Sequence, residues 1–326
     1  MTSTIKGLGA MLLAIVLIVI VPLILNATGR YDLYYTLTLI SLLSIASAGV
    51  WITFYIGRIN IGQAAYALIG GYVSAILVAT YGWSFWWTIP VAGLVCAGVA
   101  IVIGLPILRL RGVYFAMVTL VSTEVARLSA LALPITNGAK GMVNLPLPGS
   151  VSVFGLTIVP DFATLQNPRY AFYLVAVVTM LLVFLAVYRL VHSRIGKLFA
   201  ALQQNEELAS SMGVNIAGLR IIAYAISSFL GGIAGAIFSA ISQSVYPSSF
   251  TTADSINFML NCFLGGLGYV LGPLIGTFVL RFGWELLFQA AQYQLLIYSV
   301  LLIAVILLLP NGLLSLIRTS PSKGGR

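Results

Sequence analysis

Long apolar runs recur along the whole chain and are separated by short polar segments. A helix that crosses a membrane needs about 20 predominantly apolar residues. Most of the runs reach that length, and they cover about 8–25, 33–56, 61–81, 85–107, 113–133, 170–190, 218–242 and 286–309, with two shorter runs at 256–267 and 270–283. The pattern predicts an all-α membrane protein, a single domain over 1–326 with about ten transmembrane segments. A signal peptide is the alternative for 8–25, but residues 26–28 (Asn-Ala-Thr) make a poor cleavage site.

Two places depart from plain spanning helices. Residues 57–63 separate two spans with almost no loop, and the Gly- and Pro-rich residues 265–273 interrupt the apolar stretch 256–283. Helices of 12 and 14 residues reach only about 18–21 Å, less than the ~30 Å hydrocarbon core. Broken segments of this kind often mark a transport pathway. The pattern predicts broken or re-entrant half-helices near 57–63 and 256–283, and a simple packing kink is the alternative.

The charges predict how the segments are oriented. The chain is 60% hydrophobic and only 7% charged, with a net charge of +9, so lipid is its main solvent. Its basic residues are scattered, which argues against nucleic acid as a partner. With both termini in the cytoplasm, eleven basic residues lie inside and four outside, as the positive-inside rule expects. Loop 134–169 is then external and segment 193–217 cytoplasmic.

Several polar residues fall inside the predicted spans. Glu124 and Arg127 are spaced i, i+3 and share a helix face, which predicts that they form an ion pair. We expect this pair to be structural and to lie inside the bundle, and a gate element or a polar wall of the pathway is the alternative. Asn60, Gln63 and Asn261 lie near the breaks with Gly265 and Gly266. These five residues are candidates for the translocation pathway. Asn60, Gln63 and Asn261 would equally serve to bind backbone N–H and C=O groups that lose their helical partners at the breaks.

The sequence contains none of the common enzyme motifs that we considered. No P-loop, zinc-protease motif or G-x-S-x-G sequence occurs. Cys96 and Cys262 lie singly in apolar runs, and the lone His192 lies at a predicted membrane boundary. We therefore expect no cofactor, metal or disulfide and no ATPase site in this chain.

Small residues recur every fourth position in the span 218–242. They are Ser227, Gly231, Gly235 and Ser239. This spacing lets helix backbones approach closely in lipid, and it predicts a tightly packed bundle.

Segment 193–217 is helix-compatible and amphipathic, and it carries the most specific pattern in the chain. Its sequence RIGKLFAALQQNEELASSMG (194–213) resembles the coupling loop of ABC importer permeases, with a Glu-x-x-Ala-x-x-x-Gly core at Glu206, Ala209 and Gly213. The stretches at 57–77, 108–128 and 265–280 resemble the branched-chain amino acid permease family. The stretch 108–128 resembles in particular the longer of the two paralogous permeases in that family. Lys140 departs from a Gly-rich family segment, which leaves the substrate open among branched-chain amino acids, urea, amides and aromatic acids.

The resemblance implies partners and a mechanism. It implies a bacterial inner-membrane subunit that works with two cytoplasmic ATP-binding subunits, a second permease subunit (a copy or a paralogue) and a periplasmic substrate-binding protein. Transport would be ATP-driven alternating access, and a stand-alone secondary transporter or channel is the alternative. The resemblance implies contact with the ATPase through Arg194, Gly196, Lys197, Glu206, Ala209 and Gly213. We expect Ala209 to face a groove on the ATPase and Glu206 to lie clear of the membrane bundle.

Overall fold

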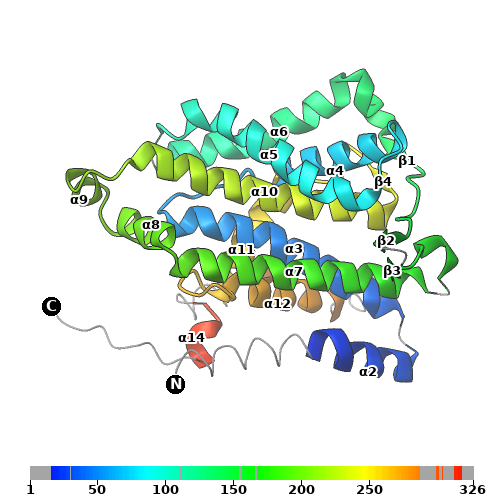
Figure 1. Ribbon diagram of the computed structural model, residues 1–326. Coiled ribbons are helices and arrows are strands. Elements are labelled where there is room, and N and C mark those ends of the chain that lie inside the picture. The colour runs from blue at the N-terminus through cyan, green and yellow to red at the C-terminus, as the bar shows by residue number, and fades with distance from the viewer. Residues whose placement is uncertain are drawn as a thin grey trace.

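The computed structural model describes residues 16–29, 31–110, 112–153, 156–165, 167–286, 299–300, 303 and 312–317. Five of the described helices are long and apolar enough to cross a membrane. They lie side by side along one direction (Figure 1) and are α3 (Asp32–Tyr55), α5 (Phe85–Ile107), α6 (Val113–Ala132), α7 (Pro168–His192) and α10 (Ile216–Ser242). All five coincide with predicted apolar runs, which confirms an all-α, polytopic membrane protein.

The remaining elements are shorter. The helices are η1 (Val16–Ile20), α2 (Val21–Thr28), α4 (Gln63–Ala79), η2 (Pro134–Thr136), η3 (Gly138–Lys140), η4 (Phe162–Thr164), α8 (Arg194–Gln204), α9 (Glu206–Ser211), α11 (Thr252–Gly265), α12 (Gly272–Leu286) and α14 (Leu314–Ile317). The strands are β1 (Met142–Val143), β2 (Val151–Val153), β3 (Leu156–Val159) and β4 (Ser244–Val245). Most of the predicted last span and the basic residues near both termini lie outside the described residues, so the count of ten segments stays a prediction.

The strands and the helices α8 and α9 lie at opposite ends of the bundle (Figure 1). β1 pairs antiparallel with β4, with Met142 opposite Val245, and this pairing ties the 134–169 loop to the end of α10. β2 and β3 form an antiparallel hairpin within the same loop. We call these the strand end and the coupling end. Loop 134–169 and segment 193–217 are thus on opposite sides, as the charge pattern predicts.

Which end faces the cytoplasm is testable with single cysteines. Lys140 at the strand end and Glu207 at the coupling end are both exposed. If the positive-inside assignment holds, Lys140→Cys reacts with a membrane-impermeant maleimide in intact cells, and Glu207→Cys reacts only after permeabilisation. The reverse pattern would overturn the orientation.

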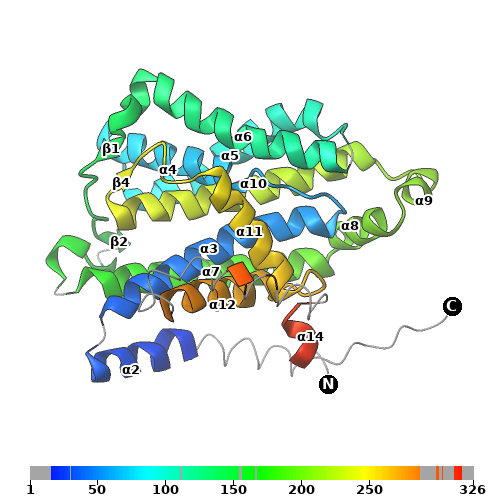
Figure 2. The same ribbon diagram turned by 180° about the vertical axis from the view of Figure 1, so that it is seen from behind.

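Both predicted breaks are present. α3 ends at Tyr55 and α4 begins at Gln63, with non-helical chain between them. α11 has 14 residues, about 21 Å at 1.5 Å per residue, and is too short to cross the core. The described part of α12 covers 15 residues. α11 is tilted across the bundle (Figure 2). The two short helices pack against each other and against α3.

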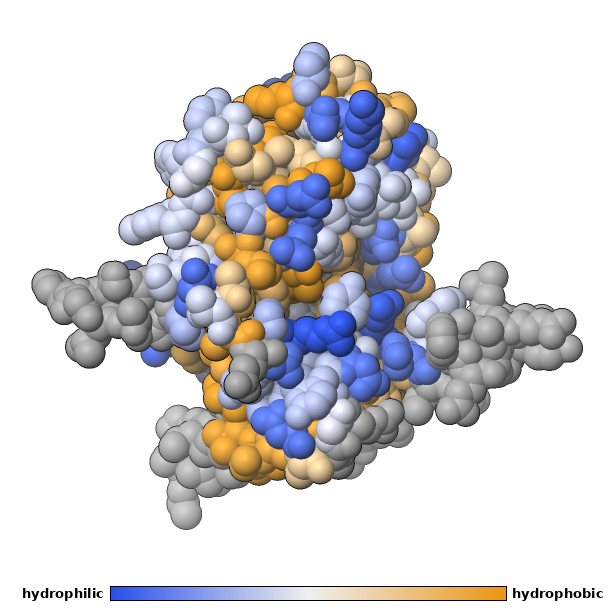
Figure 3. Space-filling model, turned by 90° about the vertical axis from the view of Figure 1, so that its right-hand side faces the viewer, coloured by the Kyte–Doolittle hydropathy of each residue, from blue (hydrophilic) through white to orange (hydrophobic). Residues whose placement is uncertain are grey.

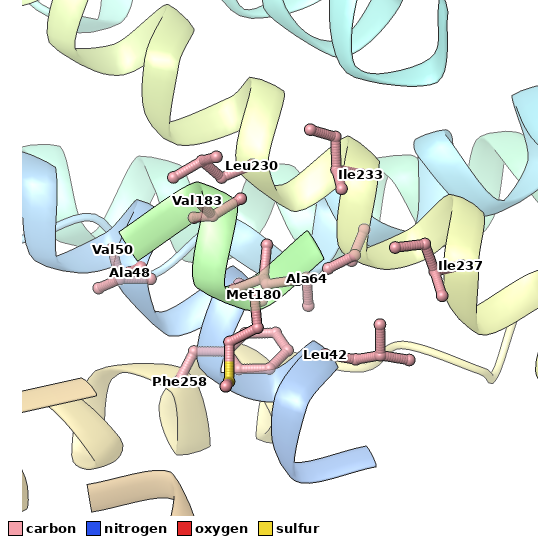
Figure 4. Close-up of a cluster of buried hydrophobic side chains, with 14 of the residues drawn as sticks. Leu42, Ala48, Val50, Ala64, Met180, Val183, Leu230, Ile233, Ile237 and Phe258 are labelled. Carbon is pink, nitrogen blue, oxygen red and sulfur yellow. The ribbon is translucent and has the colours of Figure 1, made fainter. Parts of the chain in front are cut away.

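α10 is the central helix and packs against α3, α4 and α5. Figure 4 shows apolar side chains from five helices meeting in one buried cluster, among them Leu42, Met180, Leu230 and Phe258. The stripe of small residues brings α10 very close to α4, because a Cβ at Gly235 would collide with the carbonyl oxygen of Ala67. The predicted close packing is therefore observed.

Candidate functional site

The non-helical residues 56–62 include the buried Arg58, Asn60 and Gly62, and polar side chains bind part of their backbone. The Ile61 N–H donates to Thr119 Oγ1 of α6 at 3.1 Å. The Gly62 N–H donates to the Asn60 side-chain oxygen at 2.9 Å. Irregular backbone at membrane depth needs such partners, because no water replaces the lost helical bonds. The break is thus a built feature of the fold.

The starts of the two short helices α4 and α11 meet in the bundle. The Ala64 N–H in the first turn of α4 donates to Ser255 Oγ of α11 at 3.0 Å. Ser255 Oγ also lies 3.1 Å from Thr123 Oγ1 of α6. All three residues are fully buried. The chain reaches α4 from the coupling end through residues 56–62 and reaches α11 from the strand end after β4 (Figures 1 and 2), so it approaches this junction from both sides.

The predicted pathway residues with amide side chains have different surroundings. Gln63 donates to the Ser227 carbonyl at 2.8 Å and accepts from Ser227 Oγ at 3.0 Å. Asn261 donates to Ser47 Oγ of α3 at 2.9 Å. Asn60 is fully buried, and its Nδ2 has no hydrogen-bond partner in the described part of the chain. Of the three, Asn60 is the one whose side-chain nitrogen has no hydrogen-bond partner among the described residues, and the pathway role of the set stays a prediction.

The other two predicted pathway residues are packing positions in this structure. Gly265 and Gly266 are both buried. A Cβ at Gly265 would meet the backbone of Gly272, and one at Gly266 is disfavoured because its φ is 109°. The glycines let α11, α12 and the segment beginning at Gly312 approach one another.

Residues 193–217, which resemble a coupling loop and which we call the coupling segment, bend tightly away from α7. They then pack against the break between α3 and α4. Ser193 caps α8 by accepting from the Gly196 N–H at 3.3 Å. Gly196 is buried against the carbonyls of Leu190 and Val191, which leave no room for a Cβ. Further along α8, the Gln203 side chain donates to the Phe54 carbonyl at the end of α3 at 3.4 Å.

Glu206 begins α9 and lies between two buried arginines. Asn205 caps the helix by accepting from the Leu208 N–H at 3.0 Å. The Glu206 carboxylate forms an ion pair with Arg220 at the start of α10 and lies 3.8 Å from Arg58 Nη2 in the break. Arg58 also donates to the Leu110 carbonyl at 2.6 Å. We call Arg58, Glu206 and Arg220 the tether.

The tether corrects the expectation that Glu206 lies clear of the membrane bundle. The sequence pattern had marked Arg58 and Arg220 only as basic residues near a membrane boundary. A stronger signal was available, because buried arginines need acidic partners and the chain has only seven acidic residues. Glu206 is one of the few that lie on the same side of the predicted membrane.

The two small residues of the coupling motif serve α9 itself. Ala209 is 5% exposed and packs within this chain, so the expectation that it faces a partner's groove is wrong. Gly213 has φ +80° and ends α9. Its N–H donates to the Ser210 carbonyl, and the next N–H donates to the Ala209 carbonyl, the bonding of a Schellman cap. Gly213 is therefore the C-cap glycine of α9.

The outward surface of the coupling segment is formed by other side chains. Arg194 and Lys197 are exposed, as their predicted role requires. Leu208 and Met212 are 60% and 79% exposed, and their i, i+4 spacing places them on one face of the chain. Sequence reasoning missed this pair of exposed apolar side chains, although their spacing was readable.

Glu124 and Arg127 form the predicted pair but not in the predicted place. Arg127 Nε lies 3.0 Å from both Glu124 carboxylate oxygens. The two side chains are 42% and 30% exposed on the outer side of α6, beside the exposed Val121 and Val125. The expectation of a pair inside this bundle is wrong, because periodicity shows which residues share a face but not where that face points.

We expect this pair to be needed as a pair. Removing one partner leaves a single charge among the apolar side chains of an outer helix face, where lipid solvates ions poorly. Glu124→Gln and Arg127→Gln should each lower the membrane yield of folded protein, and the double variant should partly recover it. Fluorescence-detected size-exclusion chromatography measures the yield, and strictly additive losses would contradict an interaction between the two side chains.

The fold and site define a multi-pass membrane protein with discontinuous helices and an amphipathic segment at one end. Residues 33–310 match the family described as "Branched-chain amino acid transport system / permease component". The chain belongs to this branched-chain amino acid permease family, which confirms the resemblance seen in its motifs.

The curated relatives agree. The chain is 32% identical over 278 residues to the high-affinity branched-chain amino acid transport system permease protein LivM of Escherichia coli K12. The match covers 80% of this chain and 65% of that protein, so this chain spans about two thirds of the length of that relative. It is 25% identical over 295 residues to the probable branched-chain amino acid transport permease protein LivH of Methanocaldococcus jannaschii, covering 84% and 88%. It is 26% identical over 313 residues to the ribose import permease protein RbsC of E. coli K12, covering 90% and 91%. No solved structure matches the chain.

Proposed function

We propose that this chain is the permease subunit of an ABC importer that moves branched-chain amino acids or related small polar molecules across the bacterial inner membrane. The observation that carries the proposal is the tether. It joins the segment that resembles an ATPase-coupling loop to the break between α3 and α4. A mechanical link of this kind is what a permease needs when its energy comes from another subunit.

The proposed mechanism is ATP-driven alternating access. An ATPase contacts the exposed Leu208 and Met212 side chains and displaces α9 when it closes. Glu206 transmits the displacement to Arg58 in the break and to Arg220 at the foot of α10. Residues 56–62 lack helical bonds and are the part of this region that can change conformation at least cost, since a regular helix would have to break its own ladder. Movement there would open or close a path beside Asn60.

The complete transporter would contain two cytoplasmic ATP-binding subunits, a second permease subunit and a periplasmic substrate-binding protein. Both termini and the coupling end would face the cytoplasm, and the strand end would receive substrate from the binding protein. Arg194 and Lys197 would contribute charged contacts to the ATPase surface.

ATP dependence tests the proposal. We expect proteoliposomes with the permeases, the ATP-binding subunits and the loaded binding protein to take up L-leucine with ATP but not with a non-hydrolysable analogue. Uptake driven by a proton or sodium gradient without ATP would support the stand-alone transporter and overturn the importer.

The exposed apolar pair gives a sharper test of ATPase contact. Leu208→Asp combined with Met212→Asp should reduce co-purification of the ATP-binding subunits, because two charges would enter an apolar contact. Ser210→Asp is the matched control, since residue 210 is exposed on α9 but two residues, about 200°, away from each member of the pair. Normal co-purification of the double variant would show that this face does not bind the ATPase.

A further inference from the structure

Two adjoining cavities lie at the strand end of the bundle, the inner one between α3, α10, α11 and α12 and the outer one between α3, α7 and α12. The inner cavity has a volume of about 260 Å³ and the outer one about 440 Å³. Tyr35 and Arg281 line both cavities, so the two adjoin at these side chains. Figure 3 looks straight at this end and shows hydrophilic residues gathered across it.

The inner cavity is a deep apolar pocket. Its wall on α3 runs from Tyr35 through Leu39 and Leu42 to Ala46, a separation of eleven positions or about 16 Å of helix. Phe238 of α10 and Phe258 of α11 form the facing walls. The length of this wall is about half the ~30 Å thickness of a hydrocarbon core.

The outer cavity is a mouth lined by charges of both signs. Asp32 and Arg169 come from the first turns of α3 and α7, and Arg281 and Glu285 come from α12. In the described part of the chain, none of these four side chains forms an ion pair. Two cations and two anions thus line one opening without neutralising each other.

Arg281 is the residue that needs a partner most. It is partly buried at the junction of the two cavities, and its Nε is buried without a hydrogen-bond partner among the described residues. A guanidinium nitrogen that is buried without a hydrogen-bond partner is costly, and a charged side chain between spanning helices is a candidate for a substrate site. Asp254 also lines the pocket, but its Oδ2 accepts from the N–H and hydroxyl of Thr251 at 2.7 and 2.8 Å and caps α11.

The geometry points to a binding site for an aliphatic α-amino acid at the strand end of this subunit. This inference rests on the proposed function and names its substrate class. The guanidinium of Arg281 binds the α-carboxylate. Asp32 and Glu285 at the mouth bind the α-ammonium group. The aliphatic side chain enters the apolar pocket past Tyr35. A sugar, the substrate named for the ribose relative, offers neither the charges nor the apolar group that these two cavities match.

The site also fits what the two breaks provide. The inner pocket ends at Asp254 and Phe258 of α11, and the residue between them in the same helix turn, Ser255, contacts the start of α4. A substrate in the pocket therefore lies next to the junction of the two broken helices. Conformational change at that junction is where passage onward would be controlled.

Occupancy is tested directly with a cysteine at Tyr35, in the assembled transporter without ATP. L-leucine should slow the reaction of Tyr35→Cys with a methanethiosulfonate reagent. 4-Methylpentanoate lacks the ammonium group, isopentylamine lacks the carboxylate, and D-ribose lacks both; each should protect poorly. Equal protection by all four compounds, or by none, would overturn the site.

Function is tested with Arg281→Gln, for which we expect leucine uptake at sub-saturating concentration to fall about 10- to 100-fold, the worth of one charge-assisted hydrogen-bonded contact. Lys140→Gln removes an exposed charge at the same end and should transport normally. Leu39→Trp should fill the pocket and block uptake while basal ATP hydrolysis continues, which keeps the test valid if Arg281→Gln folds poorly.

The outcomes separate this inference from the proposed function. If the unaltered transporter and both variants, Arg281→Gln and Leu39→Trp, show the same ATP-dependent leucine uptake, the importer function is supported and the proposed binding site is wrong. If both variants lose uptake but leucine never protects Tyr35→Cys, the cavities are a contact surface for a partner subunit and the site is also wrong. If the unaltered transporter needs no ATP, the proposed function fails independently of the binding result.

Discussion

Glu206→Lys is expected to abolish ATP-dependent uptake, while Glu207→Lys leaves it nearly unchanged. The lysine would replace the carboxylate between Arg58 and Arg220 and place three cations together. Breaking a buried ion pair from one side costs about 3–5 kcal/mol, and the lower end applies because Glu206 is 30% exposed. A loss of that size detaches α9 from the break and from α10.

The neighbouring Glu207 is a matched control for this experiment. It lies on the same helix with the same charge, and it is exposed. Uptake, basal ATP hydrolysis and its stimulation by the loaded binding protein should be measured for both variants. The tether predicts that Glu206→Lys keeps some ATP hydrolysis but loses the stimulation. Equal behaviour of the two variants would show that the tether has no role in coupling.

A charge exchange separates a role in coupling from a role in folding alone. Glu206→Arg combined with Arg220→Glu restores one attractive pair between α9 and α10 but leaves two cations facing each other at Arg58. We expect this double variant to recover membrane yield and to remain defective in uptake. Full recovery of uptake would mean that the Arg220 contact suffices and that Arg58 carries no signal to the break.

Gly235→Leu is expected to prevent assembly of a folded bundle, whereas Gly98→Leu is tolerated. A side chain at residue 235 has no space, because its Cβ alone would collide with the Ala67 carbonyl of α4. Overpacking a rigid core typically costs about 1–3 kcal/mol and sometimes more. Backbone cannot move aside as a flexible side chain can, so the cost should lie at the upper end.

Gly98 provides the comparison because it also lies in a long apolar helix but has nothing within 4 Å of its Cβ position. The leucine would enter open space on the outside of α5. Thermal stability in detergent and the fraction of monodisperse protein should fall for the residue 235 variant only. Similar losses for both would mean that glycine matters for helix insertion rather than for the contact of α10 with α4.

Much of the fold follows from local features of the sequence. The length of an apolar run determines whether a helix can cross lipid, so α3, α5, α6, α7 and α10 begin and end close to where the runs do. Glycine and proline weaken helices wherever they occur, so the breaks near 57–63 and 265–273 were predictable. The residues of 194–213 and of three further stretches resemble the family, and the family match over 33–310 confirms that resemblance.

The direction in which each side chain points was decided only by the tertiary structure. Glu124 and Arg127 share a helix face by spacing, but the packing of α6 against α4 turns that face outward. Ala209 and Glu206 belong to a stretch that resembles a coupling motif. The turn at Asn205 brings α9 against α8 and α10, which buries Ala209 and pairs Glu206 with Arg220.

The candidate binding site shows the same division. Arg281 and Asp32 are 249 positions apart in the sequence, and nothing in either segment predicts that they line one cavity. Hydrophobic periodicity shows which residues of a helix share an apolar face and which share a polar face, and this is a property of each helix alone. Which polar groups meet depends on how helices distant in sequence pack together, and that is a property of the assembled bundle.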